Sequence, residues 1–139
     1  MNDADGSALF LNDTSDTASP GAASFYNNTF IGGRIRCGGS SFAQKSFDSN
    51  IFYNIDPLGM GQGCVYNYSL ITPPPNLGGT GNIIGDPKFV DAANSDFHLK
   101  PSSPAIDAAD PTLANYHDYD RSPRPKGTCA DIGAFEHTP

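Results

Sequence analysis

The chain is 139 residues long and 37% hydrophobic, with no tryptophan, 15 glycines, 12 prolines and a formal net charge of −7. A length of this order fits one domain, and the frequent glycines and prolines exclude a fold built on long helices. The negative charge excludes nucleic acid and anionic membrane surfaces as partners, and no stretch approaches the ~20 apolar residues of a membrane span.

The first residues carry no export signal. Residues 1–7 are polar and acidic, whereas a signal peptide needs a basic start followed by an apolar run. We therefore expect either a cytoplasmic protein or a chain that starts inside a longer exported one. Residues 8–11 (ALFL) are apolar and predict the first strand.

Residues 24–30 (SFYNNTF) and 46–52 (SFDSNIF) form a sequence repeat. Phe25 and Phe47 are 22 positions apart, and so are Phe30 and Phe52. A period near 22, built from β-forming and turn residues, predicts a β-solenoid in which each coil holds about three short strands. The alternation within each repeat places the phenylalanines inward, where they stack on the next coil.

Asn28 and Asn50 occupy the same place in the two repeats. A single asparagine is typical of a turn, but two in register can form a ladder in which each side-chain amide bonds to the neighbouring coil. We favour this structural role over a role in sugar binding.

Later segments keep the strand-like composition but lose the spacing. Residues 64–71 and 81–84 predict further strands, and residues 72–81 predict a loop outside the stack, because its prolines have no N–H to donate. We therefore expect an all-β protein with about four coils over residues 1–84. Residues 85–139 form a capping segment of the same domain.

The last third of the chain contains four ordered motifs. They are GDPKFVD (85–91), DFHLKPSSPAIDAAD (96–110), DYDRSPRP (118–125) and DIGAFE (131–136). Together they resemble the closing segment of bacterial right-handed parallel β-helix proteins, which are pectate-lyase-like and associated with polysaccharides. The resemblance implies a short right-handed parallel β-helix with an irregular C-terminal cap, and an extracellular or cell-surface location.

We expect the capping segment to cover the apolar end of the last coil, where strand edges would otherwise be exposed. Its acidic residues lie among turns close in sequence to two arginines, which predicts bidentate Arg–carboxylate pairs with a structural role. The residues concerned are Asp107, Asp110, Asp118, Asp120, Arg121, Arg124 and Asp131.

The function expected from these features is a non-catalytic carbohydrate-binding or structural module. The repeated strands carry only Asp48 among their faces, whereas glycoside hydrolysis needs two facing carboxylates. Outward aromatic rings would supply faces for sugar stacking. The candidates are Tyr26, Phe42, Tyr53, Tyr66 and Tyr68, of which we favour Tyr53 and Tyr66.

The alternative is a small polysaccharide lyase or glycoside hydrolase that acts on an anionic polysaccharide. The resemblance implies that a lyase of this kind uses a lysine or arginine as base, commonly with calcium. Arg34, Arg36 and Lys45 flank the repeated coils and form a candidate basic strip for substrate binding.

Neither the cysteines nor the histidines predict a metal site. Cys37, Cys64 and Cys129 show no CxxC or Cys/His spacing, and we interpret them as small buried hydrophobes. An odd number leaves at least one cysteine without an intramolecular partner. The three histidines are far apart, and we expect no resident cofactor beyond the calcium of a lyase.

The N-terminal coils predict self-association. Nothing in residues 1–8 looks like a helix that would cover the first coil, and an open end of a β-helix exposes strand edges and apolar side chains. If the chain is complete, we expect a homodimer through this end, with Phe10 and Phe25 near the interface. If it is a fragment, the same surface adjoins missing coils.

Overall fold

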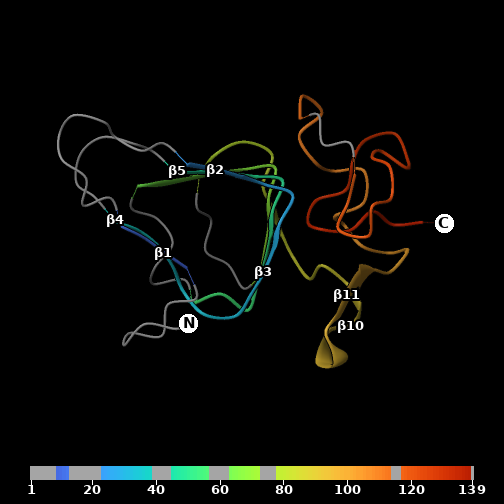
Figure 1. The fold of residues 1–139 in the computed structure, drawn as a ribbon, viewed down its shortest axis with the longest axis horizontal. Helices are drawn as coiled ribbons and strands as arrows, with labels where there is room; N and C mark the ends of the chain where they lie inside the picture. The colour runs from blue at the N-terminus through green and yellow to red at the C-terminus, as the bar shows by residue number, and fades with distance from the viewer. Residues whose placement is uncertain are drawn as a thin grey trace.

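The computed structural model describes residues 9–12, 23–38, 45–56, 63–72, 78–113 and 117–138, and these residues form an all-β structure. The strands of the repeats lie in the N-terminal two thirds of the chain, and an antiparallel hairpin with one short 3-10 helix follows (Figure 1). The elements are β1 (Leu9–Asn12), β2 (Ala23–Tyr26), β3 (Thr29–Ile31), β4 (Ile35–Gly38), β5 (Lys45–Asp48), β6 (Ile51–Tyr53), β7 (Cys64–Asn67), β8 (Leu70–Thr72), β9 (Ile83–Ile84), β10 (Phe89–Asp91), η2 (Ala92–Asn94) and β11 (Asp96–Leu99).

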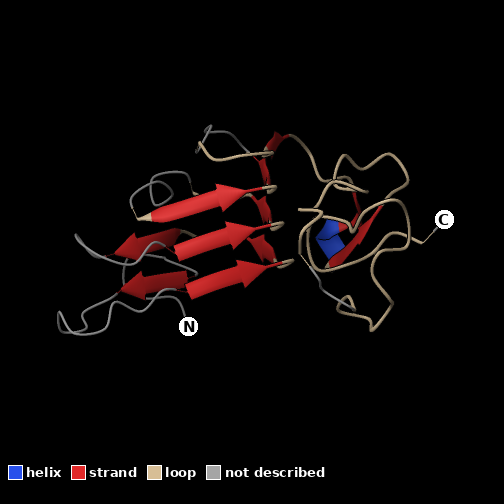
Figure 2. Cartoon of the chain, turned by 90° about the horizontal axis from the view of Figure 1, so that it is seen from above, coloured by secondary structure: helices blue, strands red, loops and turns tan. Residues whose placement is uncertain are grey.

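The described strands before residue 85 pair in parallel. A first sheet has the order β2-β5-β7, and a second sheet has the order β3-β6-β8-β9. Strands β1 and β4 form a further parallel pair, whereas β10 and β11 pair antiparallel. Because the chain alternates between the first and second sheets, strand pairs β2–β3, β5–β6 and β7–β8 stack on one another (Figure 2).

The register of the sheets reproduces the sequence repeat. Phe25 pairs with Phe47, and Phe30 pairs with Phe52. The offset between paired residues becomes shorter from β5 to β7, where Phe47 pairs with Tyr66. Strands β2, β5 and β7 have equal length, but fewer residues separate β6 from β7 than separate β3 from β5, so the sequence spacing is lost although the stacking continues.

The interior between the two sheets is filled by stacked aromatic rings. The ring centroids of Phe25 and Phe47 are 4.8 Å apart, and those of Phe47 and Tyr66 are 5.3 Å apart. In the second sheet Phe30 stacks on Phe52 at 5.2 Å. Successive side chains of a strand point to opposite faces of the sheet. Paired strands therefore place their rings at the same position along the strand, pointing inward. The predicted inward stacking is confirmed.

A residue of positive φ stands two positions before each strand of the second sheet. These residues are Asn27, Ser49, Tyr68 and Gly81, with φ of 52°, 60°, 46° and 69°. The left-handed conformation turns the chain sharply and leaves backbone groups that need partners. The residue that follows each of them supplies those partners.

The predicted asparagine ladder is present at these bends and is longer than the sequence indicated. The backbone N–H of Asn28 donates to Asn50 Oδ1 at 2.9 Å, and that of Asn50 donates to Ser69 Oγ at 3.2 Å. The N–H of Ser69 donates in turn to Asn82 Oδ1 at 3.0 Å. Asn50 Nδ2 also donates to the carbonyl of Phe25 at 2.9 Å, which joins neighbouring strand pairs.

The C-terminal segment lies against the side of the second sheet, which corrects the expectation that it covers the last coil (Figure 2). Ile51 and Leu70 point away from the aromatic interior and are buried by this segment. Their partners there include Phe89, Leu99, Ala105, Ala109 and Ile132. The second sheet carries apolar side chains on both faces. The C-terminal segment shields those on the outer face from water across several strands.

Gly133 marks the closest approach of the C-terminal segment to the second sheet. Its N–H donates to the carbonyl of Ser49 at 2.9 Å, and its φ is +97°. A Cβ at this position would lie 2.6 Å from Cδ1 of Ile51 and 3.0 Å from Oγ1 of Thr29. The glycine of DIGAFE is therefore required by contact and by backbone conformation.

We expect Gly133→Ala to lower the free energy of unfolding by about 2 kcal/mol, because strain at positive φ and the steric clash add. Urea unfolding followed by circular dichroism measures the change. Gly85→Ala is the matched control, since no atom lies within 4 Å of the added Cβ and its φ is not positive. Equal stability of the two variants would contradict the close packing at Gly133.

Several sequence predictions fall outside what the structure describes, among them the sugar-stacking candidate Phe42. The side chain of Phe10 belongs to β1 but is not described, and neither are residues 73–77 of the expected loop. The homodimer through the N-terminal coils stays a prediction.

Candidate functional site

A buried ion pair organises the C-terminal segment. Arg124 Nη1 donates to Glu136 Oε1 at 2.8 Å, and the two side chains are 1% and 0% exposed. Arg124 also donates to the carbonyls of Asp131 at 2.8 Å and Gly133 at 2.7 Å. Burial lowers the pKa of Arg124 and raises that of Glu136, and their mutual attraction opposes both shifts.

The acidic residues of the segment mainly accept hydrogen bonds from backbone amides. Asp131 accepts from the N–H of Asp107 at 2.8 Å and from that of His137 at 2.6 Å, and burial raises its pKa. Asp118 accepts from the N–H of Ser122 at 2.7 Å and from that of Glu136 at 2.9 Å. These carboxylates hold irregular backbone, so their predicted structural role is supported by a different kind of contact.

The predicted Arg–Asp pairs are replaced by other partners. Arg124 pairs with Glu136, and within the described residues Arg121 enters no ion pair. Asp107 accepts from the N–H of Cys129 at 2.9 Å, whereas Asp120 contacts His98. The prediction was wrong in its pairing because carboxylates in turns find backbone N–H groups closer than any guanidinium.

The predicted basic strip is not brought together by the described residues. Arg34 forms an ion pair with Asp56, in which Arg34 Nε lies 3.0 Å from Asp56 Oδ2. Lys45 belongs to the inward-facing row of β5 and is only 5% exposed. Arg36 lies in β4, but its side chain is outside the described residues.

The two favoured tyrosines differ in position. Tyr66 is 1% exposed in the aromatic interior, so the prediction that its ring faces a sugar is wrong. Burial raises its pKa, and its hydroxyl finds no partner in the described part of the chain. Tyr53 is half-buried and packs edge-on against Phe89, with ring centroids 5.2 Å apart. Tyr66 pairs with the inward-facing Phe47, but fewer residues separate these two than separate the paired residues of the sequence repeat. A constant period therefore does not predict that Tyr66 is buried.

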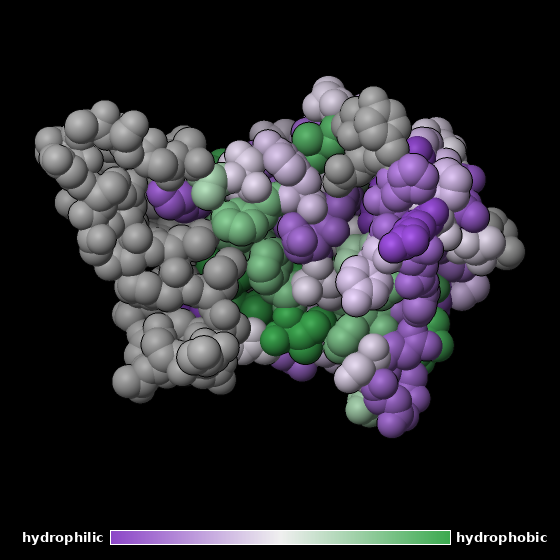
Figure 3. Space-filling model, viewed as in Figure 1, coloured by the Kyte–Doolittle hydropathy of each residue, from purple (hydrophilic) through white to green (hydrophobic). Residues whose placement is uncertain are grey.

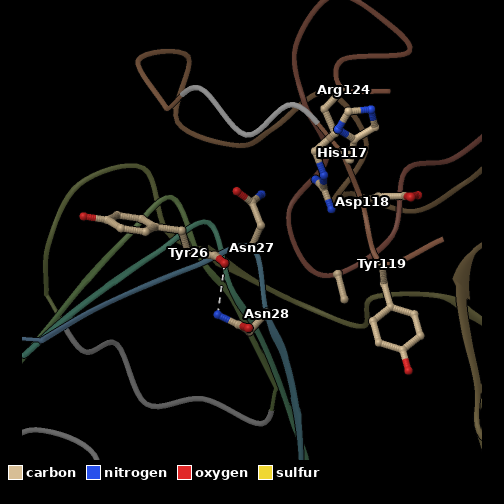
Figure 4. A pocket seen from close by; sticks show the side chains of 8 residues that line it. Tyr26, Asn27, Asn28, His117, Asp118, Tyr119 and Arg124 are labelled. Carbon is tan, nitrogen blue, oxygen red and sulfur yellow. Dashed lines mark hydrogen bonds between the residues drawn. The ribbon is translucent and has the colours of Figure 1, made fainter. Parts of the chain in front are cut away.

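An open pocket of about 250 Å³ lies between the first described bend and the C-terminal segment (Figure 4). Figure 3 shows that apolar residues gather over the strands on one face, while the C-terminal segment is mostly hydrophilic. Two separate stretches of sequence line the pocket. The lining residues are Tyr26, Asn27, Asn28, His117, Asp118, Tyr119, Arg124 and Ala134.

The pocket combines amide groups with aromatic rings. Tyr26 is 41% exposed and Tyr119 is 78% exposed, and their rings extend in different directions from the rim (Figure 4). Asn27 and Asn28 lie between them, and Asn27 Nδ2 donates to the carbonyl of Asp131 at 3.1 Å. Asn28 Nδ2 donates to the carbonyl of Tyr26 at 3.0 Å, and no donor within the described residues reaches Asn28 Oδ1.

Asn28 Oδ1 differs from the other members of the ladder in having no donor among the described residues. Oδ1 of Asn50 and of Asn82 accepts an N–H from the preceding bend, whereas Asn28 stands at the first of the bends described. Asn28 is exposed, and a side-chain amide can both donate a hydrogen bond to a hydroxyl group and accept one from it. Tyr26 and Asn28 are near neighbours in sequence, but their proximity to residues 117–119 could be found only from the fold.

The fold and the pocket define an all-β protein with two adjoining parallel sheets and an open polar pocket between tyrosine rings. In comparisons with known proteins, the chain matches no family model, no curated protein and no solved structure. In the described residues no helix is both long and apolar enough to cross a membrane. Among the same residues no group of three His, Cys, Asp or Glu side chains is arranged to hold a metal ion.

The cysteines do not all behave as small hydrophobes. Cys64 is disulfide-bonded, whereas from the sequence we interpret the cysteines as small buried hydrophobes. Cys129 is free and half-buried, with Sγ 3.3 Å from the carbonyl of Ala109.

Proposed function

We propose that this chain is a short right-handed parallel β-helix that binds carbohydrate without catalysis at the pocket between Tyr26 and Tyr119. The observation that carries the proposal is the combination in one pocket of two exposed tyrosines with asparagine side chains. Parallel strands that alternate between two sheets support the β-helix, and crossovers between parallel strands are right-handed in nearly all proteins.

The chemistry of the pocket suits a neutral sugar. Aromatic rings stack on the apolar C–H faces of a pyranose, and amide groups bond to its hydroxyls. The charged groups of the pocket are already engaged, since Arg124 pairs with Glu136 and Asp118 accepts two backbone N–H groups. A net charge of −7 further disfavours an anionic ligand.

The directions of the rings favour an oligosaccharide over a single sugar. The ring of Tyr26 extends to the left in Figure 4, away from the C-terminal segment, whereas that of Tyr119 extends downward. Two rings that point apart cannot sandwich one pyranose, but each can support a different sugar unit of a chain. The ligand we propose is therefore a neutral polysaccharide whose middle unit sits over Asn28.

The catalytic alternative has less support. A lyase base must be exposed to substrate, but Lys45 is buried and Arg34 is paired with Asp56. A hydrolase needs two facing carboxylates, and the pocket contributes Asp118 with both oxygens bonded to backbone. Release of unsaturated or reducing sugar ends by the folded protein would favour the alternative.

The disulfide supports an exported protein. Disulfides persist mainly in secreted and cell-surface proteins, because the cytosol keeps thiols reduced. We propose that the chain acts outside the cytoplasm, where polysaccharides are found.

A glycan array followed by calorimetry with the best neutral oligosaccharide tests the proposal. We expect Tyr26→Ala and Tyr119→Ala each to weaken binding about fivefold, because each removes one stacking platform worth ~1 kcal/mol. Tyr26→Phe and Tyr119→Phe keep the rings and serve as matched controls that retain most of the affinity. Failure of every neutral glycan to bind, or equal loss in the phenylalanine variants, would contradict stacking at this pocket.

A further inference from the structure

His98 on β11 contacts a carboxylate with each of its two ring nitrogens. Nδ1 lies 2.6 Å from Asp96 Oδ1, and Nε2 lies 2.8 Å from Asp120 Oδ2. A neutral imidazole has one N–H, so it can donate to only one of these acceptors. Both contacts are hydrogen bonds only when the ring is a cation.

The two carboxylates belong to different parts of the C-terminal segment. Asp96 lies in the same strand as His98, whereas Asp120 lies in a turn in which the N–H of Arg121 donates to the carbonyl of Asp118 at 3.1 Å. His98 therefore connects the β10–β11 hairpin to the turn formed by residues 118–121. Tyr119, one of the two exposed tyrosines of the pocket, belongs to this turn.

A chain of rings runs parallel to this connection. The rings of His98 and Phe135 have centroids 4.3 Å apart, and those of Phe135 and Tyr119 are 5.5 Å apart. The position of the imidazole is thus linked to Tyr119 by packing through Phe135 as well as through Asp120. A change in the charge of His98 can therefore affect Tyr119 through two sets of contacts, one through Asp120 and one through Phe135.

We propose that His98 is a pH-sensitive tie, closed as the imidazolium and loosened as the neutral ring, that fixes the 118–121 turn and the ring of Tyr119. The consequence of this tie for ligand affinity rests on the proposed function, whereas the tie itself does not. Deprotonation removes one hydrogen bond and leaves Asp96 and Asp120 facing each other without the cation between them.

The pH dependence of the His98 tie follows from the directions in which the pKa values of His98 and Asp96 are shifted. Hydrogen bonds from His98 first to Asp120 and then to Asp96 raise its pKa above the ordinary 6.5. A raised pKa means that this stabilisation is complete below about pH 6.5 and is lost as pH rises through the higher value in the folded protein. The bond from His98 lowers the pKa of Asp96 from its ordinary 3.8, so the contribution of this carboxylate is complete above 3.8 and is lost as pH falls through the lowered value. The tie is closed below about pH 6.5 and opens as pH rises through the raised pKa of His98.

The groups that face His98 from each packed element are few. Asp96 faces it from β11 and Asp120 from the 118–121 turn, and these are the charged groups that act on its pKa. The C-terminal stretch contributes the uncharged ring of Phe135, with Tyr119 behind it. Within the described residues no basic side chain competes for either carboxylate of the tie.

Proton NMR across pH 5 to 9 on the full chain tests the tie. We expect the His98 ring to titrate above 6.5 and the ring protons of Tyr119 and the amide of Asp120 to shift with the same midpoint. His98→Gln should abolish the shared titration, and the matched control His137→Gln should keep it. Asp120→Asn should lower the midpoint of His98. A His98 midpoint at or below 6.5, or signals of Tyr119 that do not follow His98, would overturn the proposal.

Oligosaccharide affinity separates this inference from the proposed function. Because exposed ion pairs contribute little, we expect binding to weaken only about two- to fivefold from pH 6 to pH 9, and not at all in His98→Gln. If no glycan binds but the Tyr119 signals titrate with the same midpoint as His98, the proposed function is wrong and the tie is supported. If glycan binds equally at both pH values and Tyr119 does not titrate with His98, the tie fails and the proposed function stands.

Discussion

Replacement of Arg124 by methionine is expected to lower the free energy of unfolding by about 4 kcal/mol. The variant leaves Glu136 buried without its counter-charge, and loss of one partner of a buried pair typically costs about 3 to 5 kcal/mol. It also removes the donors to the carbonyls of Asp131 and Gly133. Urea unfolding at pH 7 measures the difference.

Arg121→Met is the matched control for this prediction. Arg121 lies three positions before Arg124, is exposed, and enters no ion pair among the described residues, so the same substitution should change stability by less than about 0.5 kcal/mol. The double variant Arg124→Met with Glu136→Gln should recover part of the loss, because the uncompensated charge is removed. Similar stabilities for the two single variants would show that the pair does not organise the segment.

Replacement of Asn50 by alanine is expected to lower the free energy of unfolding by about 3 kcal/mol. Asn50 is fully buried, accepts the N–H of Asn28, and donates to the carbonyls of Phe25 and Asp48. Each buried polar group that loses its partner costs about 1 to 3 kcal/mol, although some groups find new partners after relaxation. Thermal and urea unfolding both report this change.

Asn28→Ala tests the same substitution at the exposed end of the ladder. Asn28 keeps its backbone bond to Asn50 in this variant, and its side chain is in contact with solvent, so we expect a loss of about 1 kcal/mol or less. Stability losses of equal size at the two positions would contradict the view that the ladder acts through its buried members.

The stacked sheets could be predicted because their determinants are local and repeated. Phe25, Phe47, Phe30 and Phe52 show the inward rows directly, and two asparagines in register indicate the ladder. The burial of Tyr66 could not be predicted from a constant period, because the loop before β7 is shorter and the offset between paired residues changes there. Alignment by strand and bend, without a fixed period, places Tyr66 under Phe47 and Ser69 under Asn50.

The position of the C-terminal segment beside the second sheet is indicated by pairs of adjacent apolar residues in β6 and β8. A strand that is covered on one face only would instead alternate between apolar and polar residues. Ile51 and Phe52 are adjacent and both buried, which requires a cover on each face of β6. Leu70 and Ile71 repeat this pattern in β8. Two apolar neighbours in each short strand therefore predict a sheet covered on both faces.

The pocket and the ion pair could not be predicted because they depend on contacts between distant segments. Asn27 and Asp131 are 104 positions apart, yet Asn27 Nδ2 donates to the carbonyl of Asp131. Glutamate is usually found on the protein surface, and only the fold reveals that Glu136 is buried beside Arg124. Sequence patterns report which face of a strand is apolar, not which turn of a later segment meets it.

Chemical-shift mapping with a neutral oligosaccharide tests the central claim most directly. Titration of the ¹⁵N-labelled protein should shift the backbone and side-chain amide signals of Asn27 and Asn28 and the backbone signals of residues 117–119, while the buried Asn50 stays unchanged. Shifts at these positions would locate a ligand in the pocket between the first described bend and the C-terminal segment. Shifts confined to other surfaces, or no shifts with any neutral glycan at millimolar concentration, would contradict the account.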